Sequence, residues 1–173
     1  MIWKSHHLVT AAGIFAITGN PLAAVLASSS ATFPDLWEME SLGMIKHRTF
    51  THWFPIYLVP LIGLVCYLYI TDTLWYSLSD LFWFLDQLPM AEFFVIMMLN
   101  ALVWILIGCL CHIVEDLLTG YVPFLTPGDR RKIHIFFYPG SPKEYFFDIL
   151  FIGLCFLYRM DDILPMLHTP ISF

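Results

Sequence analysis

The sequence predicts an all-α integral membrane protein with about three to four transmembrane helices and a re-entrant helical hairpin at the N-terminus. The chain has 173 residues, of which 59% are hydrophobic and only 13% are charged. A soluble domain carries about 25% charged residues, so the bilayer is the expected solvent. The net charge is −6, and the eight Lys and Arg residues are split among short connecting segments and form no basic patch, which argues against nucleic-acid binding. No internal repeat is apparent, and residues 1–173 are expected to form a single membrane-embedded domain.

The first apolar tract, residues 8–32, is interrupted by Gly19-Asn20-Pro21. This tripeptide is a turn signal, and it leaves two halves of about 11 residues, whereas roughly 20 residues are needed to span a bilayer. The tract is therefore one broken span or a re-entrant hairpin. We favour the hairpin, because it keeps Lys4 on the cytoplasmic side with the other basic segments. A secretory signal peptide with cleavage among residues 27–31 is the alternative.

Three more apolar tracts predict transmembrane helices over residues 53–70, 93–114 and 146–158. The last of these is short and needs its polar flanks to cross the bilayer. Residues 71–92 are acidic and rich in aromatic side chains, and they contain no Lys or Arg. We expect this segment at the outer membrane interface, where it anchors the chain.

The clearest candidate for chemistry is the segment His112-Ile113-Val114-Glu115-Asp116. On a helix, His112 and Asp116 share one face and can bind a single cation. Glu115 points about 100° away and is expected either among lipid headgroups or behind the ligands. The alternative interpretation is that His112 and Asp116 only bind each other at the membrane interface and hold no metal.

A second candidate lies just before the second tract, in His47-Arg48-Thr49-Phe50-Thr51-His52. The imidazoles of His47 and His52 suit zinc and other transition metals, and Arg48 suits a phosphate or carboxylate on a substrate. Thr51 is expected to cap the helix that follows. The alternative is a basic segment that only sets membrane topology.

Further ionisable residues flank the first tract, with His6 and His7 at its beginning and Asp35 and Glu38 after its end. Ionisable groups at the ends of membrane helices are functional candidates by default. If the hairpin forms, these residues and the two motifs meet at one membrane face. The sequence therefore predicts a metal site there.

The segments HHLVT, FPDLWE, HRTFTH and CHIVEDLLTGYVPFLTP resemble, in this order, the motifs of the LexA-regulated, YdjM-like membrane-bound metal-dependent hydrolases. The resemblance covers most of residues 7–144, including GSPKEYFF, which is similar to a late family segment with an acidic residue, here Glu144. It implies a multi-pass protein of the inner (cytoplasmic) membrane. Trp37 departs from the family pattern, which has a second aspartate at this position. The implied metal positions are His7, Asp35, His47, His52, His112 and Asp116.

These observations together predict a hydrolase that acts on an ester or phosphoester through a metal-activated water. Zinc is the expected cofactor, with manganese and magnesium as alternatives. Arg48 and Asp35 are the expected catalytic residues, Arg48 by neutralising negative charge that develops on the substrate. A site beside the lipid bilayer favours an amphiphilic or phosphate-containing substrate.

Two other functions compete with the hydrolase. A non-catalytic, metal-stabilised membrane scaffold that binds a partner is favoured by Trp37, which removes a carboxylate. An ion transporter is disfavoured, because tracts 53–70 and 93–114 have no ionisable side chain deep in their apolar interiors.

Overall fold

The computed structural model describes residues 3–40, 50–75, 78–119, 121–123, 126–127, 131–132 and 140–161. Within these ranges the chain is almost entirely helical, as predicted. The exception is a pair of two-residue antiparallel strands with Tyr121 opposite Lys132. In chain order the elements are α1 (Trp3–Thr18), α2 (Pro21–Ser30), α3 (Phe33–Glu40), the 3-10 turn η1 (Phe50–His52), α4 (Pro55–Ile70), α5 (Leu78–Gln87), α6 (Met90–Thr119), β1 (Tyr121–Val122), β2 (Arg131–Lys132) and α7 (Pro142–Tyr158).

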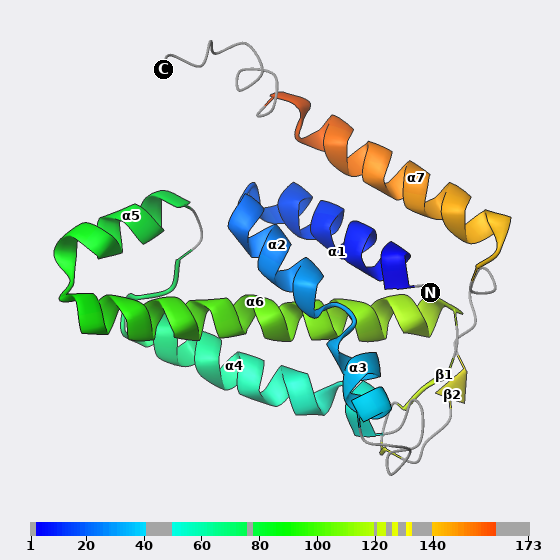
Figure 1. Ribbon diagram of the computed structural model, residues 1–173, viewed down its shortest axis with the longest axis horizontal. Coiled ribbons are helices and arrows are strands. Elements are labelled where there is room, and N and C mark those ends of the chain that lie inside the picture. The colour runs from blue at the N-terminus through cyan, green and yellow to red at the C-terminus, as the bar shows by residue number, and fades with distance from the viewer. Residues whose placement is uncertain are drawn as a thin grey trace.

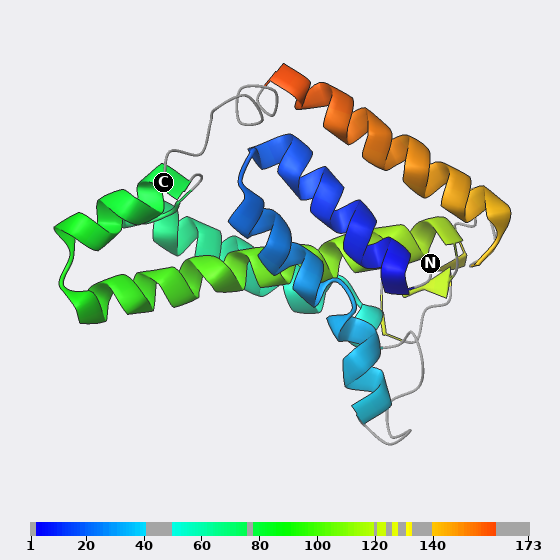
Figure 2. The same ribbon diagram turned by 45° about the horizontal axis from the view of Figure 1, so that its top comes forward.

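The longest helix, α6, forms the centre of the fold, with α1 and α2 along one side and α4 along the other (Figures 1 and 2). Its 30 residues extend over about 45 Å. Residues Met90–Leu118 are long and apolar enough to cross a membrane, and no other helix in the described part of the chain meets both conditions. The apolar helices α4 and α7 have 16 and 17 residues. The total of three to four spans therefore stays a prediction.

The N-terminal tract forms two helices joined by a tight turn, as the Gly19-Asn20-Pro21 signal predicted. Gly19 has a φ of +65°, a conformation that glycine adopts without strain. The Asn20 side chain accepts hydrogen bonds from the backbone N–H groups of Leu22 and Ala23, and Pro21 occupies the first turn of α2. The break is thus a local N-cap that starts a new helix. Whether this hairpin re-enters the bilayer stays a prediction.

Small residues bring α2 into close contact with α6. Ala27 is fully buried, and the Ser30 hydroxyl donates to the carbonyl oxygen of Ile105 at 3.0 Å. A Cβ atom on Gly108 would overlap the carbonyl oxygen of Ala27 and the hydroxyl of Ser30. The two helices therefore touch through their backbones, as membrane helices with small interface residues do.

Gly108→Ala is expected to lower the melting temperature of the protein in detergent, because α2 must move away from α6. Overpacking of this kind costs about 1–3 kcal/mol. Gly63→Ala is the matched control, since no atom lies within 4 Å of a Cβ built there. Thermal unfolding followed by tryptophan fluorescence measures both variants. Equal melting temperatures for Gly108→Ala and the wild type would contradict the close contact.

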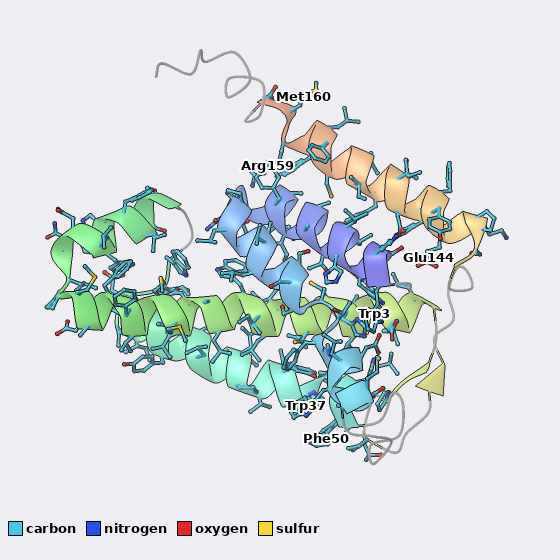
Figure 3. All side chains as sticks on the ribbon, in the orientation of Figure 1. Trp3, Trp37, Phe50, Glu144, Arg159 and Met160 are labelled. Atoms are coloured by element: carbon cyan, nitrogen blue, oxygen red, sulfur yellow. The ribbon has the colours of Figure 1, made fainter. Side chains whose placement is uncertain are left out.

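The last helix, α7, is attached to α1 by polar contacts at both ends. Near its N-terminus, Asp148 accepts a hydrogen bond of 2.6 Å from the Ser5 hydroxyl. Just beyond its C-terminus, the Arg159 guanidinium donates to the carbonyl oxygens of Ala16 and Ile17 at 2.8 and 3.0 Å (Figure 3). These carbonyls belong to the last turn of α1, which lacks intrahelical donors. The contacts hold α7 along α1 and leave its apolar side exposed.

Candidate metal centre

Four side chains that are far apart in the sequence converge where α6 approaches α3 and η1. The Nε2 atom of His52 lies 3.1 Å from Nε2 of His112, 3.3 Å from Oδ1 of Asp35 and 3.5 Å from Oδ2 of Asp116. His112 Nε2 in turn lies 3.6 Å from the same Asp35 oxygen and 3.7 Å from the same Asp116 oxygen. All four atoms lie within 4.8 Å of one another. We call these residues the four-donor cluster.

Local structure positions each member of the cluster. His112 and Asp116 are one turn apart on α6 and do share a face, as their spacing predicted. Asp35 lies in the first turn of α3, where the helix dipole favours a carboxylate. His52 ends the 3-10 turn that leads into α4. Three elements thus meet with two imidazoles and two carboxylates pointing at one place.

The geometry of the cluster fits a divalent metal ion. A tetrahedral ion with bonds of about 2.1 Å holds its ligand atoms about 3.4 Å apart. Asp35 Oδ1 is buried and accepts no hydrogen bond from the described residues, which is costly for a carboxylate unless a cation binds it. Mixed imidazole and carboxylate donors suit zinc or manganese better than magnesium, which prefers oxygen.

Charge in the cluster also favours a cation. Burial alone would raise the pKa of Asp35, but the neighbouring imidazoles of His112 and His52 hold this pKa well below its usual range. Burial alone would lower the pKa of His52, but the carboxylates of Asp116, Asp35 and Glu38 raise it to about 10. The carboxylates therefore attract positive charge, which a divalent ion can supply in place of the proton on His52.

Glu38 supports His52 from the side away from the cluster. One carboxylate oxygen of Glu38 lies 2.9 Å from His52 Nδ1, and the Thr51 hydroxyl donates to the same oxygen. A carboxylate hydrogen-bonded to Nδ1 favours the tautomer with the lone pair on Nε2, the nitrogen that would hold a metal ion. The prediction that Thr51 caps the next helix is wrong, because α4 begins at Pro55 and its N-cap residue, Phe54, makes no side-chain cap.

Glu38→Gln is expected to weaken zinc binding about 10- to 100-fold, because the imidazole of His52 loses its charged partner. Glu92→Gln is the matched control, since Glu92 is exposed in the first turn of α6. Competition with a chromogenic chelator measures both affinities. If the two variants bind zinc equally well, Glu38 has no part in the site.

Glu115 does not lie among lipid headgroups and instead is buried behind the ligands. One of its oxygens accepts a hydrogen bond of 2.9 Å from the Thr10 hydroxyl, and the other lies 2.5 Å from His6 Nδ1. The ring of His6 packs on that of His112 with 4.2 Å between centroids. Of the two positions predicted for Glu115, the second is therefore the one observed.

The structure directs His6 toward the cluster and His7 away from it. His7 Nδ1 lies 2.6 Å from the carbonyl oxygen of Ser28, and its Nε2 lies 3.5 Å from the Thr32 hydroxyl, so its ring faces α2. Adjacent residues on a helix point about 100° apart, and only one of the two imidazoles can reach α6. The predicted use of His7 as a ligand does not fit this placement. His47 and Arg48, the remaining predicted site residues, lie outside the described residues.

The sequence did not indicate which imidazole each supporting carboxylate would contact. Glu38, which the sequence indicated only as an ionisable residue near the first tract, contacts His52 and does not join the four-donor cluster. Trp37 is exposed on α3 (Figure 3). Trp3 donates from its indole nitrogen to Asp35 Oδ2 at 3.1 Å, a contact that no motif indicated.

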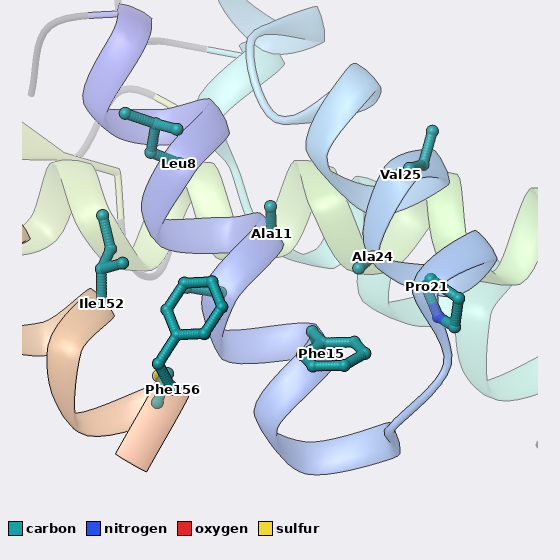
Figure 4. Close-up of a pocket in the computed structure, with 10 residues that line it drawn as sticks. Leu8, Ala11, Phe15, Pro21, Ala24, Val25, Ile152 and Phe156 are labelled. Atoms are coloured by element: carbon teal, nitrogen blue, oxygen red, sulfur yellow. The ribbon is translucent and has the colours of Figure 1, made fainter. Parts of the chain in front are cut away.

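An apolar groove on one side of the protein differs in character from the metal centre. One groove of about 350 Å³ lies between α1, α2 and α7, and Figure 4 shows Leu8, Phe15, Val25 and Phe156 around it. No carboxylate, imidazole or basic group lines it. Such a surface suits contact with lipid chains, and the chemistry-bearing residues lie elsewhere.

Comparison with protein families gives one result for nearly the whole chain. The family model described as YdjM inner membrane protein matches residues 1–169. Neither curated proteins nor solved structures gave a match. The match agrees with the resemblance seen in the sequence motifs and with the apolar helix α6. The chain therefore belongs to the YdjM inner membrane protein family.

Proposed function

We propose that this inner membrane protein is a metal-dependent hydrolase that acts on an ester or phosphoester. The observation that carries the proposal is the four-donor cluster, in which two imidazoles and two carboxylates converge at the spacing of a tetrahedral ion. His112 and Asp116 belong to the last two turns of the apolar helix α6. A site at the end of a membrane helix favours an amphiphilic substrate, with its charged group at the cluster and its apolar part in the bilayer.

A divalent ion bound there would lower the pKa of a water molecule toward neutrality and polarise the scissile oxygen. The chain's own residues would position the water molecule and the substrate. Asp35 has the most exposed side chain of the cluster, at 17%, so the substrate approaches from its side. Its Oδ2 already accepts a hydrogen bond from Trp3, which keeps the carboxylate in one orientation. Arg48 is the proposed partner of the anionic substrate oxygen.

A metal-stabilised scaffold is the second candidate function, and one feature of the cluster favours it. Structural zinc sites have four protein ligands, whereas catalytic sites keep one position for water. The four-donor cluster supplies four protein atoms, and Trp37 does not add a carboxylate to it. Hydrolysis at this ion alone would need a fifth coordination position or the release of one carboxylate.

Metal removal separates the two functions. Chelator-treated protein is expected to lose hydrolysis of anionic phosphoesters, tested on lipid phosphates in liposomes, and to regain it with zinc or manganese. Elemental analysis of protein purified without chelators, run on the same samples, reports bound metal. Bound metal with no hydrolysis across neutral and anionic esters would support the scaffold. Hydrolysis that survives chelation would exclude the metal mechanism.

A further inference from the structure

His6 is a buried imidazole that the four-donor cluster does not use. Its ring is fully buried, and it does not belong to the set of residues whose donor atoms all lie within 4.8 Å. Its Nδ1 lies 2.5 Å from a Glu115 oxygen, while its Nε2 makes no hydrogen bond to the described residues. Asp116 Oδ1 lies 3.5 Å from Nε2, beyond a good hydrogen bond, and leaving a buried imidazole nitrogen without one is costly. The arrangement indicates that Nε2 faces a ligand.

The contacts on Nδ1 prepare Nε2 to bind a cation. Hydrogen bonding to the Glu115 carboxylate places a proton on Nδ1 and leaves the lone pair on Nε2. Thr10 donates to the other Glu115 oxygen at 2.9 Å and fixes the carboxylate. The same design occurs at His52, whose Nδ1 faces Glu38 and whose Nε2 enters the four-donor cluster. Two carboxylate–histidine pairs thus approach the site from different elements.

Asp116 lies between these two imidazoles. Its Oδ2 is 3.5 Å from His52 Nε2, and its Oδ1 is 3.5 Å from His6 Nε2. Each separation is close to that of two ligands on one tetrahedral ion, about 3.4 Å. A carboxylate that offers one oxygen to each side can bridge two metal ions. In two-metal hydrolytic sites such ions lie about 3.5–4 Å apart.

We propose that His6 Nε2 and Asp116 Oδ1 hold a second divalent cation beside the first, with Asp116 as the bridge. This inference rests on the proposed function, since it requires a metal in the four-donor cluster. This second metal site has two protein ligands, so its remaining coordination positions are open to water and substrate. The anionic oxygen of a phosphoester would bind to the second ion. Substrate binding would then not require an open coordination position on the first ion, whose four ligands are all protein atoms.

Metal stoichiometry tests the proposal, and the neighbouring histidine supplies the control. Wild-type protein loaded with zinc and desalted is expected to hold two ions per chain, and His6→Ala is expected to hold one. His7→Ala should keep two, because His7 faces the Ser28 carbonyl. Glu115→Gln should weaken the second ion about 10- to 100-fold while leaving the first in place. Circular dichroism shows whether each variant keeps its helices.

Manganese provides a second readout, and its wild-type signal alone tests for two ions, even if the His6 variant does not fold. Two Mn²⁺ ions bridged by Asp116 are expected to give an exchange-coupled paramagnetic resonance signal in the wild type, and His6→Ala should give the signal of an isolated ion. One ion per wild-type chain, or two ions in His6→Ala, would overturn the second metal site and leave the proposal of the first site intact. A wild-type chain that binds no metal would overturn both this inference and the proposed function.

Discussion

Asp116→Asn is expected to remove nearly all bound metal from the purified protein while leaving it inserted in the membrane. The carboxylate of Asp116 faces His52 and His112 with one oxygen and His6 with the other. Loss of a residue that only supports a ligand costs about 10- to 100-fold in metal affinity, and loss of a ligand should exceed this. Asparagine has nearly the same volume, so the packing of α6 is preserved.

His112→Ala should have the same effect on the first ion, because it removes one of the two imidazoles of the four-donor cluster. Asp86→Asn is the control for the loss of one negative charge, since Asp86 is exposed on α5. Elemental analysis measures metal, and membrane fractionation with circular dichroism measures insertion and helical content. Normal metal content in both site variants would show that the cation binds elsewhere.

Helices α4, α6 and α7 were predictable because each is built on a continuous apolar tract, but their ends were not. Helices α3 and α5 lie outside the apolar tracts and were not predicted. The tract 93–114 became Met90–Thr119, since backbone hydrogen bonding continues through polar residues where the apolar pattern stops. The tract at 53 became a helix that starts at Pro55, after the 3-10 turn. The two-residue strands β1 and β2 have no periodic signal of their own. Hydrophobicity therefore predicted where these helices lie, whereas local contacts determine the residues at which they begin and end.

The sequence predicted that histidines and carboxylates form the site, but it did not predict which of two adjacent residues faces the site. His6 and His7 lie in α1, which is apolar on several sides, so the pattern does not reveal which imidazole faces α6. Packing decides it, because His6 meets Glu115 and His7 meets Ser28. Glu38 likewise lies one residue from the position where a carboxylate was expected, and its distance to His52 could come only from the fold. By contrast, the spacing of His112 and Asp116 did predict their shared face, because both residues belong to one helix.

Arg48→Ala is expected to lower hydrolysis of an anionic phosphoester about 10²- to 10³-fold while metal content stays near that of the wild type. Arg48 stands four residues before His52 in the sequence, and a guanidinium cannot bind a metal ion. Its role would be to grip an anionic oxygen of the substrate with two hydrogen bonds. Arg48→Lys restores the charge but not the paired donors, so it should recover only part of the activity.

Lys46→Ala is the matched control, because it removes a positive charge from the same segment and is expected to affect only membrane orientation. Metal analysis and hydrolysis of lipid phosphates in liposomes are measured on the same preparations of all variants. If Lys46→Ala reduces hydrolysis as much as Arg48→Ala, the segment acts through net charge and Arg48 has no specific contact. If the wild type binds metal and hydrolyses none of the esters, the scaffold function gains support. Trp37→Asp then becomes the decisive variant, because it restores the carboxylate of the family pattern two residues after Asp35.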